Sequence, residues 1–175
     1  MDVDDGLFSM DLETLTETMI APVADSDLVY EYFKFVHDGV LYAEYSDYSQ
    51  DESVCNVRRI QADGEELPAI EMCEAILAAG DGVLCGVHTQ AYEDGDYYVY
   101  EEYVVIYDLS TGELVQIKLG ENESIYFTEI TPRIEVVNGR IYYYVQDTTN
   151  GACMLKSMNL DGSDLRTLAK TAPIY

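Results

Sequence analysis

Basic residues are scarce in this 175-residue sequence. Nine Lys and Arg stand against 34 Asp and Glu, which gives a formal net charge of −25 at pH 7. Nucleic acids and anionic membranes bind proteins through Lys and Arg, because these residues neutralise phosphate groups. The composition therefore excludes both from the expected partners. The acid is concentrated at the start, since residues 1–57 hold 14 Asp and Glu and a single basic residue, Lys34.

Tryptophan is absent, and the only histidines are His37 and His88. A metal site or a base–nucleophile pair would need them close together with a third group. Cys85 and His88 form a Cys/His pair that nothing nearby completes. Without Trp, the chain also lacks the Ser-x-Asp-x-Gly-x-Thr-Trp box of some glycosidases and sialidases. We therefore predict no catalytic residue, no metal site and no cofactor, and the chain is not expected to be an enzyme.

Cysteine is sparse and shows no Cys-x-x-Cys spacing. An even number of cysteines permits disulfides in a secreted protein, with three pairings possible for Cys55, Cys73, Cys85 and Cys153. Cys85 and Cys153 fall in strand-like apolar runs, where a thiol packs as a small hydrophobe, so we expect free thiols. No apolar run approaches the roughly 20 residues of a membrane-spanning helix. No signal peptide or membrane insertion is expected, and the acidic start is typical of a piece of a longer protein.

Turns and strand-like runs recur along the sequence in the same order. A turn precedes a β-branched or aromatic run three times, at Asp38-Gly39, Asp81-Gly82 and Asn138-Gly139. A second kind of turn recurs at spacings of 50, 47 and 51 residues when four positions are aligned: Asp11, Gln61, Asp108 and Asn159. Repeats of about 40–50 residues with several strands each are typical of β-propeller blades.

Each repeat predicts four antiparallel strands, which gives about 14 strands for the whole chain. The Asn138-Gly139 dipeptide is the strongest hairpin signal, because a type I′ turn needs positive φ at both central residues. One segment is ambiguous. Residues 71–79 contain good helix formers with apolar residues at a period of 3.6, whereas the repeat predicts a strand there. We follow the repeat, since tertiary context overrides helix propensity.

We therefore predict an all-β fold of consecutive four-stranded antiparallel, propeller-like blades, about three and a half units in one domain over residues 1–175. The units are a half blade at residues 1–25 and three blades at residues 26–70, 71–120 and 121–170. The open edges of such an arc tend to recruit partners. A homodimer that covers them is the simplest expectation, and it should strengthen as salt screens the negative charge.

The run Gly-Arg-Ile-Tyr-Tyr-Tyr at 139–144, followed by Leu-Lys-Ser-Met-Asn-Leu-Asp-Gly-Ser at 155–163, resembles known bacterial propeller repeats. It is similar to domains related to the TolB C-terminal repeats and to the YWTD repeats of lipoprotein-receptor propellers, and closest to extracytoplasmic Firmicutes propeller domains of unknown function. The resemblance implies a ring of six or so blades that acts as a binding module, and an extracytoplasmic parent protein. It implies a fold and not an activity.

These observations favour a non-enzymatic binding or scaffold module of a bacterial extracytoplasmic protein, contacting a protein or a glycan. The alternative is a fragment of a carbohydrate-active enzyme, which would place two carboxyl groups with raised pKa in one cleft. The acidic segments 93–96 and 161–164 carry oxygen ligands suited to calcium, but we interpret them as ordinary turns. The best candidates for an exposed binding rim flank the first of these segments: Tyr92, Asp94, Asp96, Tyr97 and Tyr98.

Overall fold

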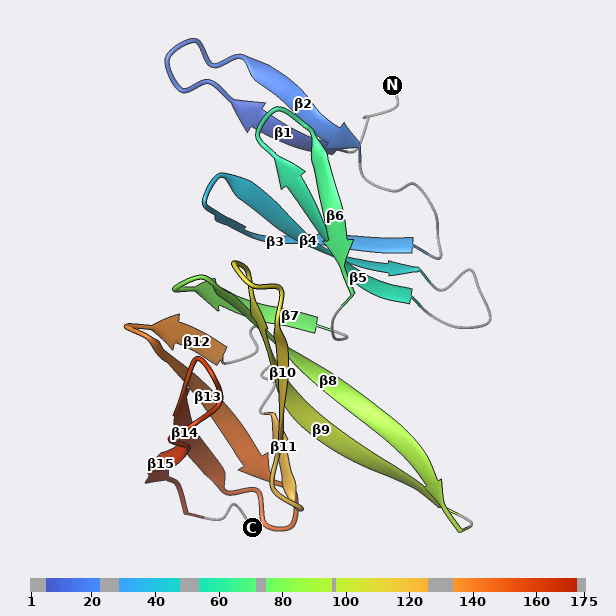
Figure 1. The fold of residues 1–175 in the computed structure, drawn as a ribbon, viewed down its shortest axis with the longest axis vertical. Coiled ribbons are helices and arrows are strands. Elements are labelled where there is room, and N and C mark those ends of the chain that lie inside the picture. Colours follow the sequence, from blue (N-terminus) through green and yellow to red (C-terminus); the bar gives the residue numbers. More distant parts are fainter. Residues whose placement is uncertain are drawn as a thin grey trace. The chain divides into compact units, whose positions relative to one another are not determined.

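The fold consists of strands. The computed structural model describes the following residues: 6–22, 29–47, 54–71, 75–95, 97–125 and 134–172. Every helix or strand element in these ranges is a β-strand, and none of them is a helix. The all-β prediction is confirmed. Figure 1 shows the strands as consecutive antiparallel groups along the chain.

The strands form four antiparallel sheets. The first pairs β1 (Gly6–Met10) with β2 (Glu17–Pro22). The second has four strands in chain order: β3 (Val29–His37), β4 (Val40–Asp47), β5 (Val54–Gln61) and β6 (Glu66–Ile70). The third repeats this order: β7 (Ala75–Gly80), β8 (Val83–Asp94), β9 (Tyr97–Asp108) and β10 (Leu114–Lys118). The fourth has five: β11 (Glu123–Ile125), β12 (Ile134–Val137), β13 (Arg140–Asp147), β14 (Cys153–Asn159) and β15 (Arg166–Lys170).

The fourth sheet departs from the predicted pattern at its first edge. Two strands share that edge, because β12 pairs with the start of β13 and the short β11 pairs with its end. The sequence predicted one strand there, from Arg133 to Val137. The propeller arrangement, which needs the sheets placed around a common axis, stays a prediction.

The hairpin turns between the first and second strands have the predicted backbone. All six central residues have positive φ, between 48° and 81°: Asp38, Gly39, Asp81, Gly82, Asn138 and Gly139. This is the type I′ conformation, which Asn, Asp and Gly adopt at the lowest steric cost. The ambiguous segment is a strand where it is described, since Ala75–Gly80 forms β7, and residues 72–74 lie outside the described residues.

An aspartate closes several of the other turns. Asp108 Oδ1 accepts hydrogen bonds from the backbone N–H groups of Ser110 and Thr111, both at 2.8 Å, and from the Ser110 hydroxyl. These three donors hold the pKa of Asp108 at about 2, with the Ser110 hydroxyl contributing most. Asp11 and Asp161 accept equivalent bonds, and the pKa of each is lowered for the same reason.

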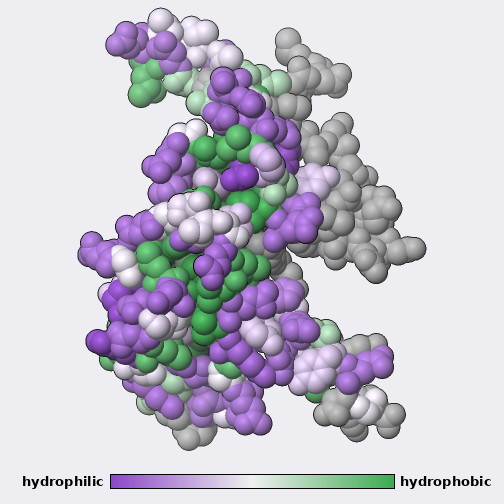
Figure 2. Space-filling view, viewed as in Figure 1, coloured by the Kyte–Doolittle hydropathy of each residue, from purple (hydrophilic) through white to green (hydrophobic). Residues whose placement is uncertain are grey.

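The chain divides into two compact units, residues 1–71 and 72–175. Among the side chains that the structure describes, the buried apolar residues of the first unit lie on the middle strands and the last strand of its four-stranded sheet: Tyr42, Ala43, Val57, Ile60 and Ile70. Hydrophilic side chains predominate on the face of the molecule drawn in Figure 2, in keeping with the net charge.

In the second unit, two sheets share one core. Alternate residues of β13 are buried, namely Ile141, Tyr143 and Val145, as strand geometry requires when one face is covered. They pack in one cluster with Cys85 and Ile106 of the neighbouring sheet. Burial raises the pKa of Tyr143 to about 12. The stacking of sheets on a common apolar layer is what fixes the position of the site described next.

The two sheets of this unit meet most closely at their first strands. A Cβ on Gly80 would lie 3.1 Å from Val136, so only glycine fits there without displacement. Beside it, Asp81 Oδ2 accepts a 2.7 Å hydrogen bond from the backbone N–H of Gly139. This bond links the β7–β8 turn to the β12–β13 turn, which are 58 residues apart in the chain.

Candidate functional site

Among the described residues, the β8–β9 hairpin extends past the strands on either side of it. Each strand has twelve residues, whereas the described part of β7 pairs with β8 as far as Val87, and β10 pairs with β9 from Tyr103 onward. From Thr89 to the tip the two strands pair only with each other in the described structure, ending with Asp94 opposite Tyr97. Figure 1 shows this ribbon extending beyond the sheet.

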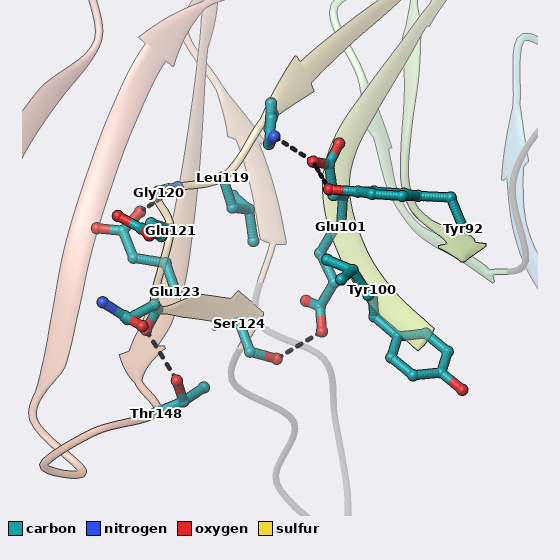
Figure 3. A pocket seen from close by; sticks show the side chains of 13 residues that line it. Tyr92, Tyr100, Glu101, Leu119, Gly120, Glu121, Glu123, Ser124 and Thr148 are labelled. Carbon is teal, nitrogen blue, oxygen red and sulfur yellow. Dashed lines mark hydrogen bonds and ion pairs between the residues drawn. The ribbon is translucent and has the colours of Figure 1, made fainter. Parts of the chain in front are cut away.

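A hollow of about 560 Å³ lies where β9 passes the end of β10. Figure 3 shows it between the β9 edge and the loop that leads into β11. Its lining side chains and backbone come from 13 residues: Tyr92, Val99, Tyr100, Glu101, Glu102, Lys118, Leu119, Gly120, Glu121, Asn122, Glu123, Ser124 and Thr148. Two of them are markedly exposed aromatic residues, Tyr92 at 42% and Tyr100 at 67%.

The Glu101 carboxylate is held in place in the hollow by three hydrogen-bond donors. Its Oε1 accepts bonds from Lys118 Nζ at 2.5 Å and from the Tyr92 hydroxyl at 3.0 Å, and its Oε2 accepts one from the Tyr103 hydroxyl at 2.7 Å. These donors, Lys118 first, hold the pKa of Glu101 at about 2. The carboxylate in turn raises the pKa of Lys118 and of Tyr103. Glu101 is therefore ionised throughout the physiological range.

Two further glutamates hold the opposite wall. Glu102 Oε1 accepts a 2.8 Å bond from the Ser124 hydroxyl, and its Oε2 a 2.9 Å bond from the Ile125 N–H. These bonds attach β11 to β9. Glu123 Oε2 accepts a 3.0 Å bond from the Gly120 N–H, and its Oε1 lies 2.6 Å from Lys156 Nζ. The loop before β11 is therefore held from both sides, and the hollow is preformed.

The hollow is anionic, and within the described residues it has an open backbone edge on β9. Four glutamates and one lysine line it, and Glu121 in the loop is exposed. The Glu102 carbonyl accepts the Leu119 N–H at 2.9 Å, so it points toward the hollow side of β9. Because strand residues alternate, the N–H and C=O of Tyr100 point the same way. Tyr100 thus offers a ring and a strand edge to an incoming ligand.

The predicted rim is placed in part. Tyr92 lies in the hollow and bonds Glu101. Asp94, Tyr97 and Tyr98 lie in the strands at the hairpin tip, where their side chains are outside the described part of the chain, and Asp96 is outside it altogether. The rim as a whole stays a prediction. The structure adds residues that the sequence reasoning missed, above all Tyr100, Glu101 and Lys118. The cross-strand register would have revealed Glu101, since Tyr92 pairs with Val99 and residue 101 lies one diagonal away on the same face.

The other candidate ligand groups are engaged elsewhere. Cys85, which is buried, and Cys153 do not form disulfides, whereas Cys73 and the Cys55 side chain lie outside the described residues. Asp161 accepts bonds from Ser163, and Asp164 pairs with Arg140 at 2.9 Å and with Arg166 at 2.7 Å. In the part of the chain that the structure describes, no three His, Cys, Asp or Glu residues are grouped to hold a metal ion.

Comparisons with protein-family models, with curated proteins and with solved structures find no match. The resemblance to bacterial propeller repeats thus stays a prediction. No helix capable of crossing a bilayer occurs among the described residues. What the chain does has to be argued from the hollow itself.

Proposed function

We propose that this chain is a non-enzymatic binding module from a bacterial extracytoplasmic protein, built from propeller blades of the TolB-like or YWTD-like kind, and that it recognises a protein ligand at the hollow beside the β8–β9 hairpin. One observation carries the proposal. The hollow is lined both by an exposed aromatic ring, Tyr100, and by a carboxylate, Glu101, that three donors keep ionised.

A basic, extended peptide segment fits this chemistry. Cationic side chains are attracted to the faces of tyrosine rings and to carboxylates. The hollow carries four glutamates, of which Glu101 is paired with Lys118 and Glu123 with Lys156. The open edge at Tyr100 can pair with the backbone of an extended segment, which is a common mode of peptide recognition. The charge of the whole chain, −25, would accelerate the approach of such a partner.

Glycoside hydrolysis is supported less well. A glycosidase needs a carboxylic acid of raised pKa that donates a proton to the leaving group. Glu101 has its pKa lowered to about 2, so it is a poor proton donor at neutral pH. The carboxyl pKa shifts resolved in the described residues are all downward: Asp11, Glu101, Asp108, Asp147, Asp161 and Asp164.

Binding of defined peptides tests the proposal. We expect peptides of about 10 residues with excess Lys and Arg to bind by calorimetry, and affinity to fall as salt rises. The variant Tyr100→Ala should lose about 10- to 100-fold in affinity, the range expected for an aromatic anchor, and Glu101→Gln should also weaken binding. The control Leu168→Ala removes a side chain that is 48% exposed on β15 and should bind normally.

Three results would overturn this assignment. One is binding of acidic and basic peptides with equal affinity, and another is full affinity in Tyr100→Ala. The third is turnover of a glycoside panel that is lost in Glu101→Gln, which would favour the carbohydrate-active enzyme. Binding only to an array of neutral glycans would move the ligand from protein to glycan.

A further inference from the structure

In the described structure the first sheet has fewer strands than the others. In the described residues β1 pairs only with β2, whereas the three later sheets have four or five strands. A two-stranded sheet is marginally stable by itself in water. The exposed apolar side chains of this hairpin are numerous for its size: Phe8, Met10, Leu12, Leu15 and Met19.

The repeat identifies which strands of the third sheet correspond to this hairpin. The β1–β2 turn is closed by a 3.0 Å bond from the Asp11 N–H to the Thr16 carbonyl, and the β9–β10 turn by the equivalent bond from Asp108 to Glu113. The hairpin β1–β2 therefore corresponds to β9–β10. In that sheet β9 has β8 on its other edge, but the corresponding edge of β1 has no partner among the described strands.

Within the described part of β1, this open edge has one of the usual protections against pairing, a bulge, and lacks the others. Proteins guard such edges with charged residues, proline or bulges that block a further strand. The β1 sequence is Gly-Leu-Phe-Ser-Met, without a charge or a proline, and the single bulge lies between Leu7 and Phe8. The Asp11 N–H points at β2, so alternation directs the N–H and C=O groups of Phe8 and Met10 toward the open edge.

We propose that β1 pairs antiparallel with β1 of a second copy of this chain, so that two hairpins form one four-stranded sheet in the order β2–β1–β1–β2. A two-fold axis at Ser9 places Phe8 of each copy opposite Met10 of the other, and the interface is self-complementary. Met19 lies opposite Phe8 on β2, so an apolar face with Phe8, Met10 and Met19 would run across the joined sheet.

Charge favours this arrangement over a parallel one. The hairpin acids Asp11, Glu13 and Glu17 lie at or next to the turn, and antiparallel pairing puts the two turns at opposite ends of the sheet. The remaining repulsion is long-range and is screened by salt. Five residues of edge bury much less than the roughly 1,200 Å² of a standard interface, so we expect a weak dimer that depends on concentration and salt.

Sedimentation equilibrium of the full chain tests the dimer. We expect 19.7 kDa at low concentration and low salt, and a mass approaching twice that value at high concentration in about 0.5 M salt. Met10→Pro removes an outward N–H without removing a β1–β2 bond and should stay monomeric, as should Phe8→Lys. The matched control Leu12→Ser removes a more exposed apolar side chain, 84% exposed, and should dimerise normally.

A cysteine at position 9 tests the register. Two Ser9 residues facing each other across the axis form a non-hydrogen-bonded pair with Cα atoms about 4.5 Å apart, within the range for a disulfide. Ser9→Cys should give a disulfide dimer on mild oxidation, whereas the unchanged chain with its native cysteines and Thr18→Cys should not. A monomer under all conditions, equal loss of dimer in Leu12→Ser, or a dimer in which Ser9→Cys does not cross-link would each overturn the proposal.

Discussion

Replacing Ile141 by alanine should destabilise the protein strongly, because this side chain lies in the core that two sheets of the second unit share. Ile141 is fully buried and sits opposite Val136 on β12 and Met158 on β14. The change removes three carbon atoms at about 0.8 kcal/mol each. The cavity left behind adds about 1 kcal/mol at ~24 cal/mol per Å³. The expected loss is about 3–4 kcal/mol.

Urea unfolding monitored by tyrosine fluorescence and circular dichroism measures this loss. In a thermal melt followed by circular dichroism, the melting temperature should fall by about 2–4 °C for each kcal/mol lost in a chain of this size. Ile141→Val should cost about 0.5–1.5 kcal/mol, and Leu168→Ala, at a half-exposed position, less than about 0.5 kcal/mol. If Ile141→Ala costs no more than Leu168→Ala, the two sheets do not share a core and the packing argument fails.

Two further changes test the electrostatics. The pKa values of Glu101 and Asp108 are lowered to about 2, below usual values near 4, so the stability that these carboxylates contribute is complete above pH ~4 and lost as pH falls through ~2. In urea titrations at a series of pH values, Asp108→Asn should be less stable than the unchanged chain at pH 7 and equally stable near pH 2; an equal difference at both would contradict the linkage. Lys156→Met removes the partner of the largely buried Glu123 and should lower the free energy of unfolding by about 2–4 kcal/mol in the same assay. The double variant Lys156→Met with Glu123→Leu should recover part of that free energy. No recovery would mean that the pair does not act as a unit.

The strands and turns of this fold were predictable because their signals are local. A type I′ turn needs positive φ at two adjacent residues, and Asn138-Gly139 and Asp81-Gly82 are among the few dipeptides that supply it. At residues 71–79 the repeat predicted a strand in spite of the helix-like pattern, and the described part, Ala75–Gly80, forms β7. Ile76 is buried and Gly80 touches Val136, and this packing outweighs the helix propensity of the segment.

The hollow was not predictable, since it depends on how far two strands outrun their neighbours. Nothing local in the sequence shows that β10 stops pairing at Tyr103, or that β11 turns back to bond Glu102. Tyr92, one of the predicted rim residues, lines the hollow, but the sequence around it does not identify the group that it bonds. Its partner Glu101 is nine residues away in sequence and reaches it only through the register of the β8–β9 hairpin.

Both proposed binding surfaces lie where the repeat is broken. A complete four-stranded sheet satisfies the backbone groups of its inner strands and leaves only two edges to protect. Among the described strands, the β8–β9 ribbon exceeds this pattern, and the Tyr100 edge is open beside an anionic hollow. In the same described part of the chain the β1–β2 hairpin falls short of it, and the uncharged Phe8–Met10 edge is open. The chemistry of the two edges differs, and so should their partners: the acidic one fits a basic segment, and the uncharged one fits its own copy.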